Sequence, residues 1–395
     1  MRPALSAVTA DVATPLLAPR FRVTAVVSTW GMEAFMDGCL RDLTSQTLYA
    51  QDAMEIVVID SGSPEGEQAI VRAWQRSHPR IVYCRTERET IYAAWNRAVL
   101  ASRGTLLVNA NCDDRHAPDC FEQMAQLLER ESVGLAYVDA LVTSNPNERF
   151  EAHNAKTVWC LPPFNLRQAL LTCPYGCTVM WRRDVHASLG LFDEAFTIAG
   201  DYEFFLRVSL AHGAAHLARP LSLYHESAGS VSHRDPARLD RELARFLPRL
   251  RRWTCIERIY PSLERGAATR SPSDGSDIVR EGCTAPEDFA SAHLDFGNLL
   301  LDPRLRGSAP DAEFHYRRAL ELAGPRPAIL WNVAQALRLQ GRIEEADATR
   351  AVAVRRNPSL EGLPPQSLIG VRHPVLNRMP PVVYETWVPF SVPAT

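Results

Sequence analysis

The sequence lacks any long apolar run. No stretch approaches the roughly 18–20 residues that a membrane-spanning helix requires, so we expect no transmembrane segment. A strong charge of one sign is also missing: the formal net charge is −3, which argues against a general attraction to nucleic acid or anionic membrane. The nine cysteines lack the paired spacing of a disulfide framework or zinc site, so we expect reduced thiols in the cytoplasm.

The first 20 residues do not resemble a secretory signal, because Asp11 and several prolines interrupt their apolar residues. We expect a disordered arm over residues 1–20. The chain is 46% hydrophobic and 23% charged, as in soluble globular proteins, and its 395 residues suffice for two or three domains.

Predicted strands and helices alternate from Arg22 to about Val142. This order predicts an α/β domain with a mixed, mostly parallel sheet and helices on both faces. The predicted strands are Val23–Ser28, Glu55–Ile59, Ile81–Cys84, the run from Thr105 and Leu135–Val142, and the predicted helices are Glu33–Gln46, Gly66–Ser77, Tyr92–Ser102 and Pro118–Glu131.

The regular pattern is lost between Asn145 and Thr172, where Asn, Pro, His and Trp indicate loops over a binding face. A strand over Gly176–Trp181 and helices over Asp201–Ala211 and Arg238–Trp253 follow. The Gly/Ser/Pro-rich stretch Gly266–Pro286 predicts a linker.

Beyond the linker the chain predicts an all-α repeat module. Gly307 and Gly341 are 34 residues apart, and two alanine pairs share this offset: Ala312 with Ala346, and Ala319 with Ala353. This period resembles the tetratricopeptide repeat, in which small residues let paired helices approach closely. An ordinary helical hairpin with accidental spacing is the alternative.

These patterns divide the chain into six parts. We expect the disordered arm at 1–20, the α/β domain at 21–235, a helical extension at 236–265, the linker at 266–285, the helical repeats at 286–360, and a Pro- and aromatic-rich tail at 361–395.

An acidic cluster, Asn111-Cys112-Asp113-Asp114, directly follows a strand that reads as buried. Open α/β sheets place their ligands at the carboxyl ends of strands. Mg²⁺ is usually held by one or two carboxylates together with substrate phosphates, so the cluster predicts a metal–diphosphate site. A solvated turn or a helix N-cap is the alternative reading of the tetrapeptide alone.

Three further polar segments are predicted at strand ends or a helix start of the same domain. In an open parallel sheet they face one edge together with the acidic cluster. Asp60 offers acceptors for a base or ribose, and the main chain at Ser28 and Thr29 offers donors for a base or phosphate. The segments are Ser28-Thr29-Trp30, Asp60-Ser61-Gly62-Ser63 and Thr90–Asn96.

Taken together, these segments resemble the family-2 glycosyltransferases of the GT-A fold. The likeness covers about Phe21 to Ser232, and it includes Gln46-Thr47 after the first predicted helix. The acidic cluster matches the family's Asp-x-Asp metal motif. Gly190-Leu191-Phe192-Asp193 and Gly200-Asp201-Tyr202-Glu203 resemble the segment that carries its catalytic base.

The resemblance implies a role for each matched residue. Asp201 is the expected general base, and Asp113 the expected ligand of Mn²⁺ or Mg²⁺. The implied reaction moves a sugar, with inversion, from a nucleotide sugar to an acceptor hydroxyl, and a UDP-sugar is the expected donor. The expected nucleotide contacts are Ser28, Thr29, Asp60, Asn96 and Asn111.

The metal site departs from the family at a histidine that some members use near the end of the domain. Ser227 stands at that place here, and His225 and His233 lie close to it in sequence. We therefore keep His225 as a second candidate metal ligand. Arg207, a usual family position, either orients the base or pairs with an acid across a helix face.

Two other classes of protein are alternatives. The main alternative is a catalytically degenerate GT-A scaffold whose helical repeats act as a protein-interaction module. A nucleotidyltransferase is disfavoured because Ser28-Thr29-Trp30-Gly31 is not a Gly-rich phosphate loop. The expected partners are the nucleotide sugar, a glycan, lipid-linked or protein acceptor, and a protein partner on the repeats, but no nucleic acid.

A basic segment bears on membrane contact. Arg249-Leu250-Arg251-Arg252-Trp253 lacks the Gln of the processive members' motif, and no transmembrane helix follows it. Peripheral contact with the inner face of the cell membrane through this helix is left open beside a solvated helix, the favoured reading.

Overall fold

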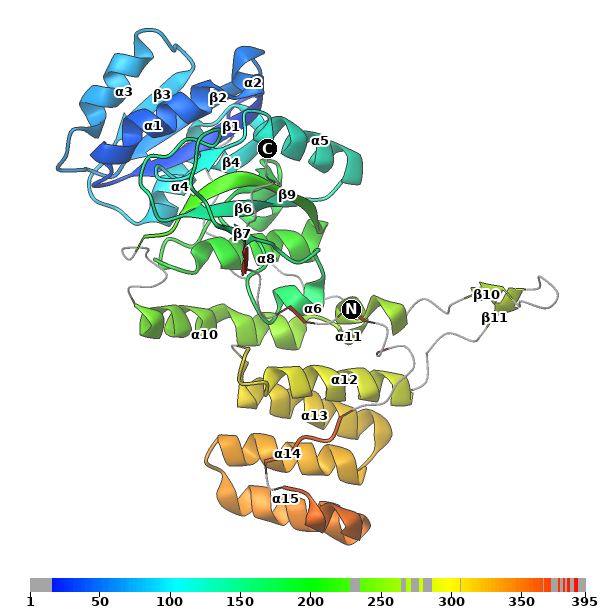
Figure 1. Ribbon diagram of the computed structural model, residues 1–395. Coiled ribbons are helices and arrows are strands. Elements are labelled where there is room, and N and C mark those ends of the chain that lie inside the picture. Colours follow the sequence, from blue (N-terminus) through cyan, green and yellow to red (C-terminus); the bar gives the residue numbers. More distant parts are fainter. Residues whose placement is uncertain are drawn as a thin grey trace. The chain divides into compact units, whose positions relative to one another are not determined.

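The computed structural model describes residues 16–227, 235–263, 268–270, 277–279, 286–305, 307–364, 366–370, 376, 379–380, 382–383 and 387–389. The chain divides into two compact units (Figure 1). The first comprises Met1–Phe164, Cys173–Leu243 and Glu385–Thr395, and the second comprises Asn165–Thr172 and Ala244–Tyr384. Most of the predicted N-terminal arm and linker, with His233 and the segment Gly229–Ser232, lie outside the described residues.

The first unit is built on one mixed sheet, which confirms the α/β prediction. Among the described residues the sheet has ten strands, in the order β12-β7-β6-β8-β4-β1-β2-β3, with β9 pairing β6 and β5. The strands are β1 (Phe21–Thr29), β2 (Met54–Asp60), β3 (Ile81–Arg85), β4 (Gly104–Asn109), β5 (Arg115–His116), β6 (Leu135–Thr143), β7 (Thr157–Trp159), β8 (Val179–Arg182), β9 (Ala214–His225) and β12 (Trp387–Pro389).

Strand β1 is central to the parallel half of this sheet. It pairs in parallel with β2 and with β4, and β2 pairs in parallel with β3. In the other half β8 runs antiparallel to β4 and β6, and β7 antiparallel to β6. The predicted strands at β1–β4 and β6 are present, whereas the sequence patterns missed β9.

Helices cover both faces of the sheet, and successive side chains of β1 point to these two faces in turn. Val23, Ala25 and Val27 belong to one core with buried residues of α1 and α5. Ser28 points to the other face, where α4 packs against β1 and β2. The helices of this unit are α1 (Glu33–Thr44), α2 (Thr47–Ala50), α3 (Glu67–Gln75), α4 (Ile91–Ala101), α5 (Cys120–Glu131), α7 (Val185–Leu189) and α8 (Gly200–His212).

The second unit is mainly helical, and α12 to α15 lie side by side in chain order (Figure 1). Helices α13 and α15 begin 343 − 309 = 34 residues apart, and the alanines of both predicted pairs are fully buried. Their assignment to the tetratricopeptide family stays a prediction. The bounds are α6 (Leu166–Ala169), α11 (Ile256–Ile259), η1 (Pro261–Leu263), β10 (Ala268–Arg270), β11 (Asp277–Val279), α12 (Pro286–Leu300), α13 (Ala309–Ala323), α14 (Pro327–Leu339), α15 (Ile343–Arg356) and η2 (Pro358–Gly362).

Helix α10 (Pro236–Trp253) carries the basic segment and crosses the boundary between the units. Arg251 is buried, and its guanidinium lies 3.3 Å from the fully buried carboxylate of Asp311, which Arg252 also contacts at 2.9 Å. Arg249 lies over the ring of the exposed Trp253. Part of this basic segment therefore neutralises a buried acid, so it is not simply a solvated face.

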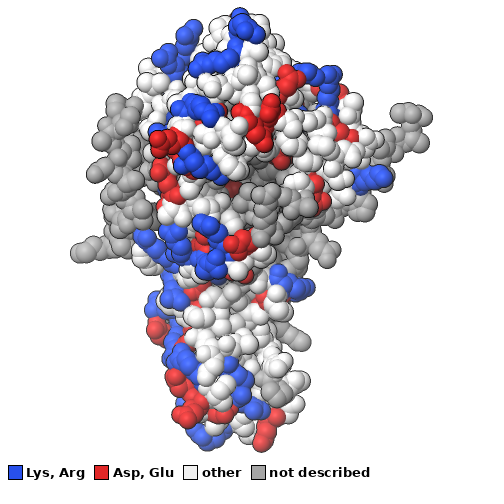
Figure 2. All heavy atoms as spheres, turned by 90° about the vertical axis from the view of Figure 1, so that its left-hand side faces the viewer, with Lys and Arg blue, Asp and Glu red and all other residues white. Residues whose placement is uncertain are grey.

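The described residues contain no helix that is long and apolar enough to cross a membrane. On the face drawn in Figure 2, basic and acidic side chains are interspersed, which fits the small net charge of −3.

Candidate active site

The parallel register brings the predicted polar segments to one edge of the sheet. Thr29 lies opposite Asp60 where β1 and β2 end. The N–H of Ala110, just after β4, donates to the carbonyl of Val26, so the acidic cluster follows at the same edge. The thiol of Cys112 then donates to the carbonyl of Ser28 (3.4 Å). Three of the predicted segments are thus neighbours.

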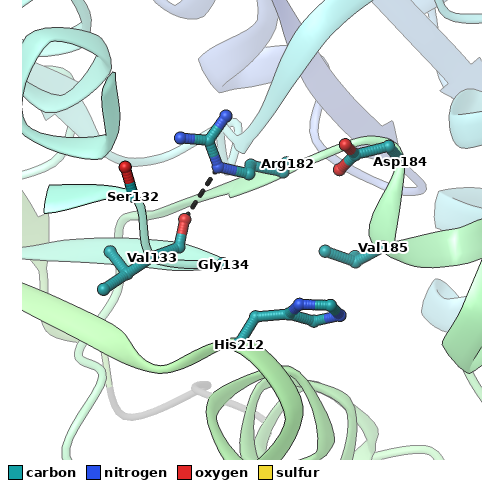
Figure 3. A pocket seen from close by; sticks show the side chains of 7 residues that line it. All are labelled: Ser132, Val133, Gly134, Arg182, Asp184, Val185 and His212. Atoms are coloured by element: carbon teal, nitrogen blue, oxygen red, sulfur yellow. Dashed lines mark hydrogen bonds between the residues drawn. The ribbon is translucent and has the colours of Figure 1, made fainter. Parts of the chain in front are cut away.

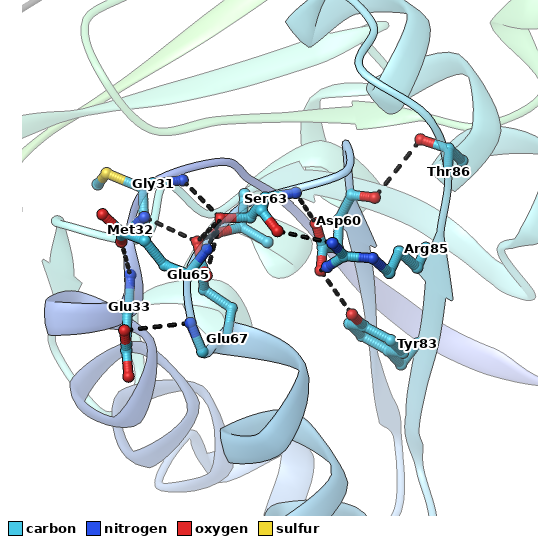
Figure 4. A network of polar contacts seen from close by, with 12 residues as sticks. Gly31, Met32, Glu33, Asp60, Ser63, Glu65, Glu67, Tyr83, Arg85 and Thr86 are labelled. Atoms are coloured by element: carbon cyan, nitrogen blue, oxygen red, sulfur yellow. Dashed lines mark hydrogen bonds and ion pairs between the residues drawn. The ribbon is translucent and has the colours of Figure 1, made fainter.

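Asp60 is fully buried, and both its oxygens already accept hydrogen bonds (Figure 4). Oδ1 accepts the N–H of Ser63 (2.7 Å), and Oδ2 accepts Tyr83 Oη–H (2.6 Å) and Arg85 (2.5 Å). Burial, with the bond to Asp60, raises the pKa of Tyr83 to about 12. These bonds hold the Asp60 carboxylate in place, and its contact with nucleotide stays a prediction.

A second buried carboxylate, Glu67, ties the loop after β1 to the loop after β2 (Figure 4). It accepts Thr29 Oγ1–H (3.2 Å), the N–H of Met32 (2.8 Å) and Ser63 Oγ–H (2.8 Å). Ser63 Oγ in turn accepts the N–H of Gly31 (3.0 Å). The sequence analysis missed Glu67, because a Glu in the first turn of a helix gives no sign that it is buried.

The same loop presents Trp30 to solvent. Its side chain is 46% exposed, and the guanidinium of Arg88 lies 4.0 Å from the ring centroid. An exposed aromatic ring next to the strand ends offers a surface on which a base can stack.

The acidic cluster contains one partly exposed and one buried carboxylate. Asp114 is buried, and it accepts Asn111 Nδ2–H (2.9 Å) and the N–H of His225 (3.1 Å). Burial, with the neighbouring charge of Asp113, raises the pKa of the Asp114 carboxyl to about 8. Asp114 therefore holds the turn through these two hydrogen bonds, while the side chain of Asp113 is 27% exposed.

A buried arginine supports the turn from behind. Arg115 donates to the carbonyls of Cys112 (2.8 Å) and Asp114 (2.5 Å), and to Asn147 Oδ1 (2.9 Å). Gly38 in α1 leaves room for this guanidinium, since a Cβ there would lie within 2.4 Å of it.

His225, at the end of β9, faces the carboxylate of Asp113. Its Nδ1 is 3.7 Å from Asp113 Oδ2, and this buried nitrogen has no hydrogen-bond partner among the described residues. The part of the chain that the structure describes contains no cluster of three or more His, Cys, Asp or Glu side chains that fits a metal. The pair nevertheless suits a cation whose other ligands are waters and substrate phosphates, as is usual for Mg²⁺.

Asp201 lies at the N-terminal end of α8, partly buried. Its Oδ1 accepts the N–H of Tyr202 (2.7 Å) and Tyr92 Oη–H (3.2 Å), and Tyr92 also contacts the carbonyl of Ile198 (2.7 Å). Burial raises the pKa of the Asp201 carboxyl above its ordinary value, and the charge of Glu242 adds to this rise. A raised pKa makes a carboxylate a stronger base at neutral pH.

Glu242 holds the loop that leads into α8. Its carboxylate accepts three consecutive main-chain N–H groups, of Thr197 (3.0 Å), Ile198 (2.9 Å) and Ala199 (2.9 Å), and the hydroxyl of Thr197 (2.8 Å). These bonds hold the pKa of Glu242 below its ordinary value, although burial opposes them. Nothing in the sequence around Glu242 signals this role.

Helix α4 connects Asp201 with the strand ends. Tyr92 reaches Asp201, and Trp95, three residues later, donates to Ser28 Oγ (3.2 Å). Asn96, predicted to contact nucleotide, instead donates to the carbonyl of Phe192 (2.9 Å) and accepts its N–H (2.9 Å). Asn96 therefore holds the Gly190–Glu194 loop, and its contact with nucleotide stays a prediction.

Arg207 holds the other end of that loop. It donates to the carbonyls of Leu189 (2.5 Å) and Leu191 (3.0 Å), and it pairs with Glu203 one helical turn away (2.7 Å). Of the two roles considered for Arg207, these contacts favour pairing across a helix face.

A hollow of about 180 Å³ lies away from these residues, between the start of β6 and the end of β8 (Figure 3). The hollow and His225 lie at opposite ends of β6. Thr143, the last residue of β6, pairs with His225, whereas Gly134, which lines the hollow, directly precedes the first residue of β6. None of the predicted site residues lines it. The lining residues are Ser132, Val133, Gly134, Arg182, Asp184, Val185 and His212.

Residues 24–190 match the family model described as Glycosyl transferase family 2. Two proteins of Bacillus subtilis (strain 168) named as glycosyltransferases are similar: EpsH is 28% identical over 102 residues, and EpsJ 21% over 233. The matches cover 26% and 53% of this chain, and only 29% and 62% of those proteins. The crystal structure of S. aureus TarS 1-349 is similar at a TM-score of 0.49 and 13% identity, over 86% of this chain and 91% of TarS 1-349.

We predict that Glu67→Gln destabilises the protein by about 1–3 kcal/mol, because an amide places N–H groups where buried donors need an acceptor. Glu65→Gln is the matched control: Glu65 accepts the N–H of Glu33 in the same loop pair, but it is exposed. We expect it to change stability by less than about 0.5 kcal/mol. Urea unfolding of both variants measures the difference, and equal effects would contradict the role assigned to Glu67.

Proposed function

We propose that this protein moves a sugar from a nucleoside diphosphate sugar to an acceptor hydroxyl, with inversion and with Asp201 as general base. The match of residues 24–190 to the family model Glycosyl transferase family 2 supports this proposal. The observation that carries the proposal is the carboxylate of Asp201, held at a helix start by Tyr92 with a raised pKa. As the acceptor we propose a glycan, a lipid-linked molecule or a protein that carries a hydroxyl group.

In the proposed reaction Asp201 takes the proton of the acceptor hydroxyl as the oxygen attacks the anomeric carbon. The bond from that carbon to the diphosphate breaks, and the nucleoside diphosphate leaves with the electron pair. One displacement inverts the anomeric centre. Tyr92 and the main-chain N–H of Tyr202 keep the Asp201 carboxylate oriented throughout.

The nucleotide would lie over the ends of β1, β2 and β4. Trp30 offers its exposed ring to the base, and Asp60, which is fully buried beside it, stays a proposed contact of a base N–H or a ribose hydroxyl. Ser28, Thr29 and Asn111 stay proposed contacts on the same edge. A UDP-sugar is the donor that we propose to test first.

A divalent cation, Mn²⁺ or Mg²⁺, would be held by Asp113 with help from His225. Bound there, it would supply positive charge to the leaving diphosphate. Asp114 and Arg115 serve this site by holding the turn that presents Asp113.

We predict that Asp201→Asn lowers turnover of nucleotide sugars by about 10²–10⁴-fold, the usual contribution of a general base. Release of nucleoside diphosphate from UDP- and GDP-sugars, with Mn²⁺ present, measures it. Asp184→Asn is the control, since Asp184 lines the hollow at the opposite end of β6.

Full turnover by Asp201→Asn would remove Asp201 from the base role while leaving the transferase proposal intact. If the wild-type chain binds no nucleotide sugar, the degenerate-scaffold alternative replaces the proposal.

We predict that Asp113→Asn and His225→Ala each weaken Mn²⁺ binding in the presence of UDP by at least about tenfold. Titration calorimetry measures the affinity directly, and removal of the metal with EDTA should abolish turnover. His153→Ala serves as a histidine control outside the proposed metal pair. Unchanged affinity in His225→Ala would show that Asp113, phosphates and water suffice.

We predict that Glu242→Gln moves the acidic limb of the kcat/KM profile to lower pH. The charge of Glu242 raises the pKa of Asp201, so its removal lowers that pKa, and Asp201 stays ionised to lower pH. Tyr92 and Cys173 also lie near Asp201, and the variant keeps both.

Asp240→Asn, two residues away on α10, makes the same charge change on another side of the helix and should leave the profile in place. A profile that does not move in Glu242→Gln, or that moves equally in both variants, would contradict the coupling between Glu242 and Asp201.

A further inference from the structure

The loop between β6 and β7, residues 144–156, adjoins the proposed metal pair of Asp113 and His225. It begins directly after Thr143, which pairs with His225 at the end of β9. One residue of this β6–β7 loop, Asn147, contacts both the arginine behind the acidic turn and the start of α1. The loop therefore reaches the metal pair at its first residue and again through Asn147.

Asn147 holds the guanidinium that supports the acidic turn. Its Oδ1 accepts a hydrogen bond from Arg115 Nη2 (2.9 Å), and Arg115 Nη1 donates to the carbonyls of Cys112 (2.8 Å) and Asp114 (2.5 Å). Arg115 is buried, so few alternative partners can replace these acceptors. The two carbonyls flank Asp113 in the sequence, so the bond to Asn147 ties the turn that presents Asp113 to the β6–β7 loop.

The other end of the Asn147 amide is anchored to α1. Nδ2 donates to the carbonyl of Ala34 (2.8 Å), in the first turn of that helix. The next residue, Phe35, packs against His225, with 5.4 Å between the two ring centroids. A carbonyl only accepts and a guanidinium only donates, so these two partners orient the amide with its oxygen toward the guanidinium.

The β6–β7 loop is itself held in shape. Asn147 has a φ of +59°, in the left-handed region that Asn tolerates better than most residues. The carboxylate of Glu148 accepts Thr143 Oγ1–H (2.5 Å), the N–H of Asn154 (3.0 Å) and Asn154 Nδ2–H (2.6 Å). These bonds close the loop on the end of β6, and they keep Asn147 in front of Arg115.

We propose that Asn147 is a positioning residue of the metal site. It holds Arg115, and through Arg115 the turn that presents Asp113, so that Asp113 and His225 can share one cation. This inference rests on the proposed function, because the cation is the one that the proposed reaction uses. Asn147 itself contacts neither the metal nor the substrate. Loss of a residue that orients a metal ligand from behind typically costs about 10–100-fold in metal affinity.

The test measures the affinity for Mn²⁺ by titration calorimetry of the full chain with UDP present. Asn147→Gly removes both side-chain bonds but accepts the same φ, so the loop can keep its path. We expect this variant to bind Mn²⁺ at least about tenfold more weakly than the wild-type chain. Ser132→Gly is the matched control, because Ser132 also has a positive φ (53°) but lines the hollow at the opposite end of β6. It should leave the affinity unchanged.

A conservative variant tests the route through Arg115. Asn147→Asp keeps an oxygen for Arg115 and tolerates the same φ, although it cannot donate to Ala34. The charge of the new carboxylate orients it toward the guanidinium, so this variant should bind Mn²⁺ like the wild-type chain. An affinity as weak as that of Asn147→Gly would show that the effect does not pass through Arg115, and it would overturn the proposal.

Two further measurements separate positioning from a general loss of structure. Urea unfolding of Asn147→Gly, and its affinity for UDP with EDTA present, should both match those of Ser132→Gly. An Asn147→Gly chain that does not fold, or that loses UDP affinity without metal to the same extent as Mn²⁺ affinity, would make Asn147 a structural residue and overturn the proposal.

The wild-type chain distinguishes failure of this inference from failure of the proposed function. If the wild-type chain binds no Mn²⁺ with UDP present, the cation of the proposed function and the role of Asn147 are both overturned. If it binds Mn²⁺ and Asn147→Gly binds equally well, only the role of Asn147 is overturned.

Discussion

The position of β1 between β2 and β4 determines where Thr29, Asp60 and the acidic cluster lie. In this register Thr29 lies opposite Asp60, and Val26 lies opposite Asn109. A slip of one residue would turn Ser28 toward α1 and α5 and move Val23, Ala25 and Val27 to the face covered by α4. The burial of both faces of β1 resists such a slip, because one face packs against α1 and α5 and the other against α4.

Buried carboxylates hold the loops around this edge in a recurring way. Glu67 gathers donors from the loops after β1 and β2, and Glu242 gathers three consecutive N–H groups before α8. A carboxylate that accepts several hydrogen bonds in a site with little water makes strong contacts and tolerates little displacement. The loops that carry Thr29 and Asp201 are therefore held by acids that do not themselves belong to the proposed chemistry.

The C-terminal part of the chain serves both units. Residues 366–370 lie on α12 and α14 of the helical unit, whereas β12 pairs with β7 at the edge of the sheet. A C-terminal deletion would thus alter the sheet as well as the helical face. In the helical unit Asp311 is held between Arg251 and Arg252, which accounts for two charges of the basic segment on α10.

Sequence patterns determined the alternating elements of the first unit, the mixed sheet and the strand-end placement of Ser28, Asp60 and Asp113, because apolar periodicity and turn residues are local signals. Contacts between distant segments decided the rest. No local pattern indicated strand β9, and His225 approaches Asp113 only because β9 pairs with β6. The burial of Asp60 and Asp114, and the support of Asp201 by Tyr92 and Glu242, depend on residues 23 to 111 positions away. Hydrogen bonds and charge interactions between residues so far apart in the sequence form only once the chain has folded.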